Sequence, residues 1–328
     1  MQRILALLRR AMPALVLSAA AVVPGMARAA YPEQPIKMIV SYAPGGGSDV
    51  IARLTAQYMT RYLPNNPSIV VVNRPGAGGG IGFAELARAP ADGYTIGMIN
   101  TPNVLTIPIE RKSNFHWQDY DLLGNVVDDP DNFSVRADSQ FSTLKDLVAY
   151  AKAHPGELTY GTTGIGSDDH LAALLLEKAA GIKMTHVPFK GASEVLNALV
   201  GKQITVAAMN IGEALAAVNG GNKIRQLGQM SAARTNVAPG VPTFREQGFD
   251  IIMASLRGFA APKGLPAPVH DQLVAALKKT AADPEFQAKA AAYFAPMRYL
   301  EPGAYAAELK DTEVAFRQLW QVMPWGDK

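Results

Sequence analysis

The segment from Tyr42 to Asp49 is rich in glycine and directly follows an apolar run, Ile36 to Ser41, with the composition of a strand. Beyond the glycines, apolar residues from Val50 to Tyr58 recur with helical spacing. A turn between a strand and a helix directs backbone N–H groups towards one point, which favours a bound anion. The segment lacks the lysine of a P-loop and the glycine spacing of a dinucleotide site, so it favours a small anion such as a carboxylate. A turn that merely connects a strand to a helix is the alternative.

Residues 1–29 have the pattern of an export signal. Arg3, Arg9 and Arg10 precede an apolar stretch, 11–23, that is short for a membrane span. Ala27-Arg28-Ala29 has the small-x-small pattern of a cleavage site. A short membrane anchor is the alternative. We expect cleavage after the signal and exclude these residues from the fold.

Charge and cysteine content narrow the function classes. The full chain has a formal net charge of +3, but the signal contains four arginines and no acid, so the mature chain has a charge of −1. Because no basic patch is interleaved with aromatic residues, we expect no nucleic-acid partner. The chain has no cysteine, which excludes thiol catalysis, thiolate metal sites and disulfides. The five histidines show no metal-ligand spacing, and export without disulfides suits a bacterial periplasm.

Strands and helices alternate along the rest of the chain, which predicts an α/β fold. The expected order in the first part is strand 36–40, helix 50–63, strand 69–72, a second glycine-rich turn at 74–82, helix 83–89 and strand 95–99. We expect the short, β-branched run 69–72 to be a buried strand. Such a strand–helix order predicts a parallel sheet with right-handed crossovers.

The alternation begins again beyond a further strand, expected at 122–127. Ser142 is the expected N-cap of a helix over 143–153. Another turn rich in glycine and hydroxyl groups, Gly161 to Ser167, precedes a helix over 168–180 that Gly181 ends. The remaining expected elements are strands over 158–160, 185–188, 204–209 and 224–230, and helices over 192–200, 212–219, 267–282, 284–292 and 303–322.

The two hydroxyl- and glycine-rich turns each follow a strand, and ligands of open α/β sheets bind at the carboxyl ends of strands. Two such half-sites on two lobes would face each other across a cleft, as in binding proteins that close about a hinge. The helical tail is expected to pack on the first lobe. We therefore predict a discontinuous first lobe, residues 30–131 and 251–328, and a second lobe, residues 132–250, each a mostly parallel sheet flanked by helices.

Short motifs spread over nearly all of the mature chain carry a family resemblance. They are Tyr31-Pro32 with Pro35-Ile36, Pro44 to Asp49, Asn73 to Gly79, Ala89 to Thr95, Ala151 to Gly156, Tyr160 to Thr162, Gly166-Ser167 with His170-Leu171, Val187 to Gly191, and Pro239 to Phe244 with Glu246 and Gly248. In this combination the chain resembles the substrate-binding receptors of tripartite tricarboxylate transporters, often called the Bug family.

The resemblance implies a two-lobed periplasmic binding protein of type II. It also implies a monomer without enzymatic activity, cofactor or metal. Its ligand would be a small organic acid, a di- or tricarboxylate or an aromatic carboxylate, which it delivers in a transient contact to a membrane permease. In the family the carboxylate is held largely by backbone groups and ordered waters, and bridging waters let one loop frame accept acids of different shape.

The ligand-binding residues that we predict come mainly from the two turns. Those in the turns are Ala43, Pro44, Gly45, Gly46, Gly47, Ser48, Asp49, Thr162, Thr163, Gly164, Gly166 and Ser167. Those elsewhere are Thr101, Asn103, Asp129, His170, Phe189, Lys190, Gly191, Met209 and Asn210. Structural roles are the alternatives for Asp49, which suits the helix dipole, and for His170 and Lys190, which could brace their loops.

Two departures from the family pattern leave the ligand open. The acidic cluster Asp128 to Asp131 is either a solvated turn or a source of an acid that faces the cleft and binds an amine or hydroxyl group. Thr205 and Met209 stand where the family usually has aspartates, and Met209 predicts a less polar far wall. The alternative function is therefore a sensor or binding protein for an uncharged or cationic compound, such as an amine or a catechol.

A third hypothesis, an exported hydrolase, starts from Ser48, Ser167, Asp49 and His170. The nucleophile-elbow spacing is absent around the serines. Both serines also lie in loops, so nothing in the sequence fixes the geometry of a triad. We therefore favour a binding protein over an enzyme.

Overall fold

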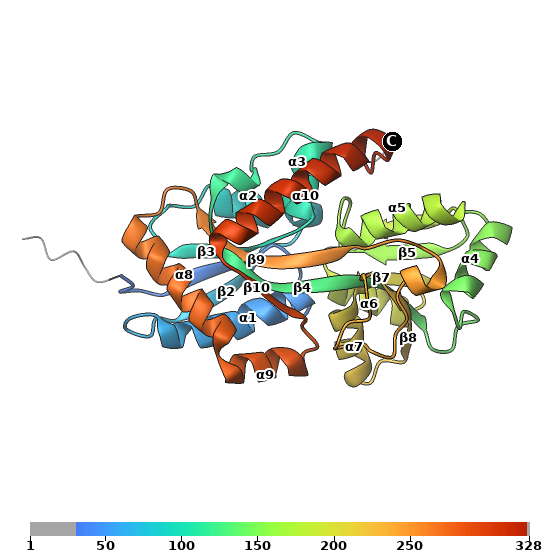
Figure 1. Ribbon diagram of the computed structural model, residues 1–328, viewed down its shortest axis with the longest axis horizontal. Coiled ribbons are helices and arrows are strands. Elements are labelled where there is room, and N and C mark those ends of the chain that lie inside the picture. The colour runs from blue at the N-terminus through green and yellow to red at the C-terminus, as the bar shows by residue number, and fades with distance from the viewer. Residues whose placement is uncertain (1–30, 327–328) are drawn as a thin grey trace, which may run out of the picture. The chain divides into compact units, whose positions relative to one another are not determined.

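The computed structural model describes residues 31–326, so the predicted export signal lies outside the described residues. A ten-stranded sheet in the order β2-β1-β3-β9-β4-β7-β5-β6 runs through them, with β10 and β8 also paired to β4 (Figure 1). The strands are β1 Ile36–Val40, β2 Ile69–Asn73, β3 Thr95–Asn100, β4 Tyr120–Arg136, β5 Thr159–Thr162, β6 Thr185–Pro188, β7 Val206–Asn210, β8 Ile224–Gln229, β9 Ala254–Pro262 and β10 Met297–Leu300.

Strand β4 divides the sheet into two halves because it changes partners along its length. From Tyr120 to Pro130 it pairs antiparallel with β9, and from Asp131 to Arg136 it pairs antiparallel with β7 and β8. We call β1, β2, β3, β9, β10 and this first part of β4 the first sheet half, and the remainder the second sheet half. The strands β1 to β3 are mutually parallel, as are β5 to β7, which confirms the predicted parallel order within each half.

Helices cover the sheet. They are α1 Gly47–Met59, α2 Gly80–Ala87, α3 Asn103–Glu110, α4 Leu144–Ala153, α5 Asp168–Ala180, α6 Ala192–Val200, α7 Ile211–Asn219, α8 Ala267–Ala282, α9 Pro284–Ala292 and α10 Pro302–Val322. Helices α1, α8 and α9 pack together on one face of the first sheet half, and α2, α3 and α10 lie on the other (Figure 1). The predicted tail helices therefore contact elements of the predicted first lobe. No helix among residues 31–326 combines the length and apolar character needed to cross a membrane.

Burial on both sides explains the apolar run of the central strand β1. Ile36, Met38 and Val40 are buried in one core cluster with Ile51 and Tyr58 of α1. A strand covered by helices on both faces has a near-continuous apolar sequence rather than an alternating one. The pattern thus predicted β1 with its observed bounds.

Three sequence predictions need correction. Strand β2 is an edge strand and not a buried one, because it pairs only with β1 among the described strands and leaves Val70 49% exposed. The N-cap of α4 is Thr143 and not Ser142, since Thr143 Oγ1 accepts the N–H of Asp146 at 3.1 Å. The strand expected at 122–127 lies in the N-terminal part of the much longer β4, which also includes the acidic cluster. That cluster is therefore part of a strand and not a solvated turn.

Candidate ligand-binding cleft

The two predicted turns meet the opposite sheet half at short range. Ala43 N–H donates to the carbonyl of Lys190 at 3.1 Å, and Ser193 Oγ donates to the carbonyl of Pro44 at 3.0 Å. On the other side, Thr106 Oγ1 donates to the carbonyl of Gly166 at 2.6 Å. These contacts join residues far apart in sequence across the boundary between the halves. The cleft is therefore closed.

A small cavity of about 20 Å³ remains inside the closed cleft, enough for about one water molecule. Helix α1, the end of β3, the second turn and the start of α7 all contribute to its wall. The lining residues are Tyr42, Gly46, Gly47, Ser48, Asn100, Thr163, Asp168, Ala192, Asn210, Glu213 and Ser255. Five of them, Gly46, Gly47, Ser48, Thr163 and Asn210, belong to the predicted ligand-binding set.

Asp49 holds the first turn in shape. Its Oδ2 accepts the N–H of Gly45 at 3.0 Å, and its Oδ1 accepts Asn73 Nδ2 at 2.9 Å and pairs with Arg53. Burial alone would raise the pKa of Asp49, but the bonds from Arg53, Gly45 and Asn73 outweigh it and lower the pKa. Both oxygens of the Asp49 carboxylate are thus bound by residues of the first turn, β2 and α1.

The start of α1 keeps part of its donor capacity. Its first N–H, on Gly47, donates to Glu213 Oε1 at 2.7 Å. The N–H groups of Ser48 and Asp49 have no acceptor among the described residues. A Cβ at Gly47 would lie 2.5 Å from Glu213 Oε1 and 2.6 Å from Arg257 Nη2, so the close approach requires glycine here.

The second turn satisfies most of its own donors. Thr163 donates to Asp169 Oδ2 through both its N–H and its hydroxyl, at 2.9 and 2.7 Å. Gly166 N–H donates to His170 Nδ1 at 3.1 Å, and Ser167 Oγ caps α5 by accepting His170 N–H. Burial, followed by the charge of neighbouring His186, lowers the pKa of His170 to about 3, so His170 is neutral at pH 7. Its role in this structure is to brace the turn.

Arg257 lies at the centre of a buried charge network. It is 2% exposed, and its Nη1 lies 3.1 Å from Asp129 Oδ2 while its Nη2 lies 3.3 Å from Glu213 Oε1. Nη2 also donates to Asn210 Oδ1 at 3.0 Å. Burial raises the pKa of Asp129 to about 7 although the arginine opposes this shift. Arg257 was not a predicted site residue because it lies on β9, a strand that the sequence analysis did not identify.

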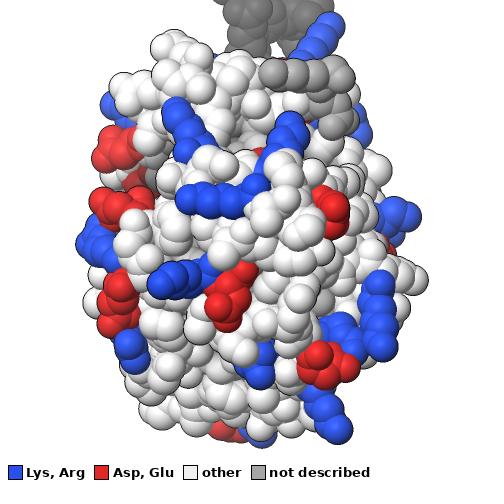
Figure 2. Space-filling model, turned by 90° about the vertical axis from the view of Figure 1, so that its right-hand side faces the viewer, with Lys and Arg blue, Asp and Glu red and all other residues white. Residues whose placement is uncertain are grey.

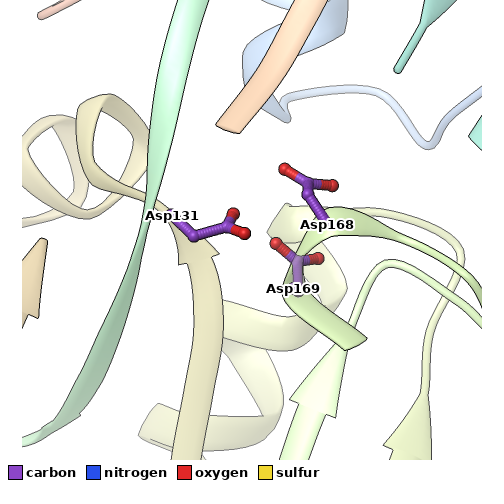
Figure 3. A group of neighbouring side chains, drawn as sticks. All are labelled: Asp131, Asp168 and Asp169. Atoms are coloured by element: carbon purple, nitrogen blue, oxygen red, sulfur yellow. The ribbon is translucent and has the colours of Figure 1, made fainter. Parts of the chain in front are cut away.

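A trio of buried aspartates adjoins this network (Figure 3). Asp131 projects from β4 towards Asp168 and Asp169, which form the first turn of α5, and ligand oxygens of the three lie within 4.8 Å of one another. Asn210 Nδ2 donates to Asp131 Oδ1 at 3.0 Å and to Asp168 Oδ2 at 2.8 Å. Burial, and then the neighbouring carboxylates, raises the pKa of Asp131 and of Asp169. Among the described residues, this trio has the spacing to share a cation.

A larger pocket of about 220 Å³ shares Gly46, Gly47, Ala192 and Glu213 with the small cavity. Val50 of α1, Leu196 of α6 and Met209 of β7 give it an apolar wall, and Arg257 lies in its lining together with Asp129. The predicted residues in this lining are Gly45, Gly46, Gly47, Asp129 and Met209. The less polar wall expected from Met209 thus belongs to this pocket.

The other predicted residues lie around the two cavities without lining them. Thr101 Oγ1 accepts the N–H of Leu256, and Asn103 Nδ2 donates to the carbonyl of Gly78. The rest belong to the two turns, to the first turn of α5 or to the segment before α6, and they are Ala43, Pro44, Asp49, Thr162, Gly164, Gly166, Ser167, His170, Phe189, Lys190 and Gly191. Six residues that line the small cavity were missed, and they are Tyr42, Asn100, Asp168, Ala192, Glu213 and Ser255. The neighbouring Asp131, Asp169 and Arg257 were missed as well.

Buried and surface charges differ in this protein. Positive and negative side chains are interspersed over the face shown in Figure 2. In contrast, the buried cleft holds the acids Asp129, Asp131, Asp168, Asp169 and Glu213 against Arg257.

The protein has two sheet halves with a closed cleft between them, and solved periplasmic binding proteins match it along nearly its whole length. It is a two-lobed periplasmic binding protein of type II. The family model described as the tripartite tricarboxylate transporter family receptor matches residues 51–296, and the chain belongs to this family.

Individual relatives agree with this assignment. The chain is 31% identical to the UPF0065 protein in the gbd 5' region of Cupriavidus necator, covering 89% of this chain and 88% of the relative. It is 33% identical to protein BugT of Bordetella pertussis, covering 71% and 72%. The solved structure of the periplasmic binding protein BugD is 31% identical with a TM-score of 0.84, covering 91% of this chain and all of that one.

Two solved structures with bound acids share the fold at lower identity. They are Rpa4515 of R. palustris with adipate and MatC of Rhodopseudomonas palustris with malate, both 24% identical. The TM-scores are 0.84 and 0.80, and the matches cover 89% and 88% of this chain and 97% and 98% of the solved chains.

Proposed function

We propose that this protein is a periplasmic receptor that captures a small organic acid in its cleft and presents it to the membrane permease of a tripartite tricarboxylate transporter. The observation that carries the proposal is the start of α1. Ser48 lines the small cavity, and the N–H groups of Ser48 and Asp49 have no acceptor among the described residues. A helix N-terminus stabilises a carboxylate through such donors and through its dipole.

The fold supports closure of two lobes about a hinge. We propose the first lobe as residues 30–131 and 251–328 and the second as 132–250. The change of partner on β4 between Pro130 and Asp131 supports this division. Because the small cavity holds about one water molecule, an acid that binds at the start of α1 requires the lobes to separate and then close on it.

The family and its solved members support an acid as the ligand. Proteins of the same fold have been solved with adipate and with malate, both dicarboxylates. The pocket lined by Val50, Leu196 and Met209 would accept the apolar part of an aromatic or extended acid. The residues that hold the ligand are proposed from the two turns and from the lining of the two cavities.

Isothermal titration with succinate, malate, adipate and benzoate tests the function. Saturable binding of at least one acid is expected, and saturation by a neutral sugar with no heat from any acid would refute an acid receptor.

Two substitutions separate the backbone donor from the hydroxyl. Ser48→Pro removes both, in the first helical turn where proline is tolerated, and should weaken binding at least tenfold. Ser48→Ala keeps the N–H and should weaken binding less; circular dichroism controls for folding.

A further inference from the structure

Gly166 joins the second turn to the proposed first lobe. Its carbonyl accepts Thr106 Oγ1 of α3 at 2.6 Å, and its N–H donates to His170 Nδ1 at 3.1 Å. A Cβ at Gly166 would lie 3.0 Å from Thr106 Oγ1 and 3.3 Å from Trp325 Nε1. The buried Gly166 therefore lies between the first turn of α5 and two side chains of the proposed first lobe.

The end of α10 brings Trp325 to this place. Met323 leaves the helix at a φ of −151° and a ψ of 75°, because Pro324 follows it and the residue before a proline disfavours helical geometry. Gly326 lies against α3, since a Cβ there would be 3.4 Å from Glu110 Cγ. Figure 1 shows α10 passing beside α3 and ending on the side of the second sheet half. The sequence thus ends the helix where Trp325 can reach the second turn.

Aromatic side chains of α10 hold Trp325 in place. Its indole is 2% exposed, and its ring centroid lies 4.7 Å from that of Trp320 and 6.5 Å from that of Phe316, both in edge-to-face geometry. Its Nε1 has no hydrogen-bond acceptor among the described residues. Trp325 therefore contacts the second turn through its shape and its apolar surface, and not through a hydrogen bond.

Opening of the cleft would carry Gly166 away from Trp325 and expose part of the indole to water. Because apolar surface is more favourable when it is buried, the indole favours the closed position of the second turn. That turn is one of the two predicted half-sites for the acid. We propose that Trp325 is a positioning residue that holds the second turn in the closed cleft, so that the affinity for the acid depends on the segment 323–326. This inference rests on the proposed function as an acid receptor.

A single-tryptophan protein tests the contact itself. The chain has three tryptophans, so Trp117→Phe combined with Trp320→Phe leaves Trp325 as the reporter. When the acid that binds best in the isothermal titration is added, the emission of Trp325 should shift to shorter wavelength. Quenching by acrylamide should fall about twofold, because closure buries the indole. Unchanged emission and quenching in a protein that binds the acid would overturn the proposal.

Substitutions measure the effect on affinity. Trp325→Ala should weaken binding of the same acid about tenfold, because the second turn loses a contact that holds it closed. Trp325→Phe should remain within about threefold of the wild type, since an aromatic ring is retained and the indole N–H makes no hydrogen bond to the described residues. Trp117→Ala is the matched control. It removes an indole that donates to Glu313 of α10 at 2.7 Å, and it should leave the affinity unchanged.

The outcomes separate the two proposals. Equal binding by the wild type and Trp325→Ala would overturn the positioning role and leave the acid receptor in place. Equal losses in Trp325→Ala and Trp117→Ala would indicate a general effect of disturbing α10 and would also overturn it. Absence of binding by all acids would end both proposals. Urea unfolding controls for folding, and if Trp325→Ala does not fold, the single-tryptophan protein decides.

Discussion

Asp129 should make this protein more stable in weak acid than at neutral pH, relative to a variant that lacks the carboxyl group. Burial raises its pKa from 3.8 to about 7. In the unfolded chain the group loses its proton near pH 4, but the folded protein keeps it up to about pH 7. Because the native state then binds more protons, its contribution to stability is full below pH 4 and falls as the pH rises to 7.

The size of the effect follows from the width of this window. Each pKa unit corresponds to about 1.4 kcal/mol, so about two units between pH 5 and pH 7 give about 3 kcal/mol. His170 acts in the opposite direction, because its pKa is lowered to about 3 and its contribution is lost as the pH falls below 6.5. Because His170 is present in both proteins, its contribution cancels when the stability of the wild type is subtracted from that of Asp129→Asn. The variant retains an acceptor for the N–H of Gly212, which now bonds Asp129 Oδ1 at 3.0 Å.

Urea unfolding, followed by tryptophan fluorescence, measures the effect at pH 5, 6, 7 and 8. Trp325 is 2% exposed, so its emission should report the loss of structure. The stability of Asp129→Asn relative to the wild type should increase by about 3 kcal/mol from pH 5 to pH 8, with most of the change complete by pH 7. A difference that is constant over this range would refute the assignment of a raised pKa to Asp129.

Three further substitutions probe the cleft. Arg257→Met leaves Asp129 and Glu213 buried without their cation, so urea unfolding at pH 7.5 should show a loss of about 3–5 kcal/mol; a loss under 1 kcal/mol would contradict this role. Asn210→Ala removes the donor shared by Asp131 and Asp168 and should cost about 1–3 kcal/mol in the same assay, with no effect expected if solvent replaces the amide. Gly164→Ala places a Cβ 2.8 Å from Gly78 Cα at a φ of +132°. It should therefore weaken binding of the best acid at least tenfold and reduce the ligand-dependent compaction that small-angle scattering measures. Unchanged compaction would mean that the two turns need not meet.

The sequence predicted elements well where the signal is local. Helix α5 begins and ends as expected, because Ser167 caps one end and Gly181, at a φ of 63°, ends the other. Strand β9 was missed although its nine residues are mostly buried. Its sequence contains Arg257 and Gly258, which weaken an apolar pattern, and its position depends on pairing with β4 more than 120 residues earlier. Such non-local pairing cannot be inferred from periodicity.

The site residues were also predictable only where the sequence signal is local. The glycine-rich turn before α1 was predictable because its strand, turn and helix are contiguous. Glu213 and Arg257 were not, because a charged residue on a short helix or an unidentified strand is normally expected at the surface. They reach the site only when α7, β9 and α1 come together. Glu213 Oε1 then lies 2.7 Å from Gly47 N, and Arg257 Nη1 lies 3.1 Å from Asp129 Oδ2. The acidic cluster was noticed, but β-strand alternation alone decides that Asp129 and Asp131 point inward while Asp128 pairs with Arg298.

The carboxylate of Glu213 limits which hydrogen-bond donors are available to an acid in this cleft. It already accepts the N–H of Gly47 and pairs with Arg257, so it holds α1 against the second sheet half without any ligand. An acid that binds at the start of α1 must therefore use the remaining donors on Ser48 and Asp49 or displace Glu213. Displacement would cost Glu213 the hydrogen bond from Gly47, although Arg257 would still pair with it. An acid that uses the N–H groups of Ser48 and Asp49 leaves both contacts of Glu213 in place, so these two donors are the expected anchor of its carboxylate.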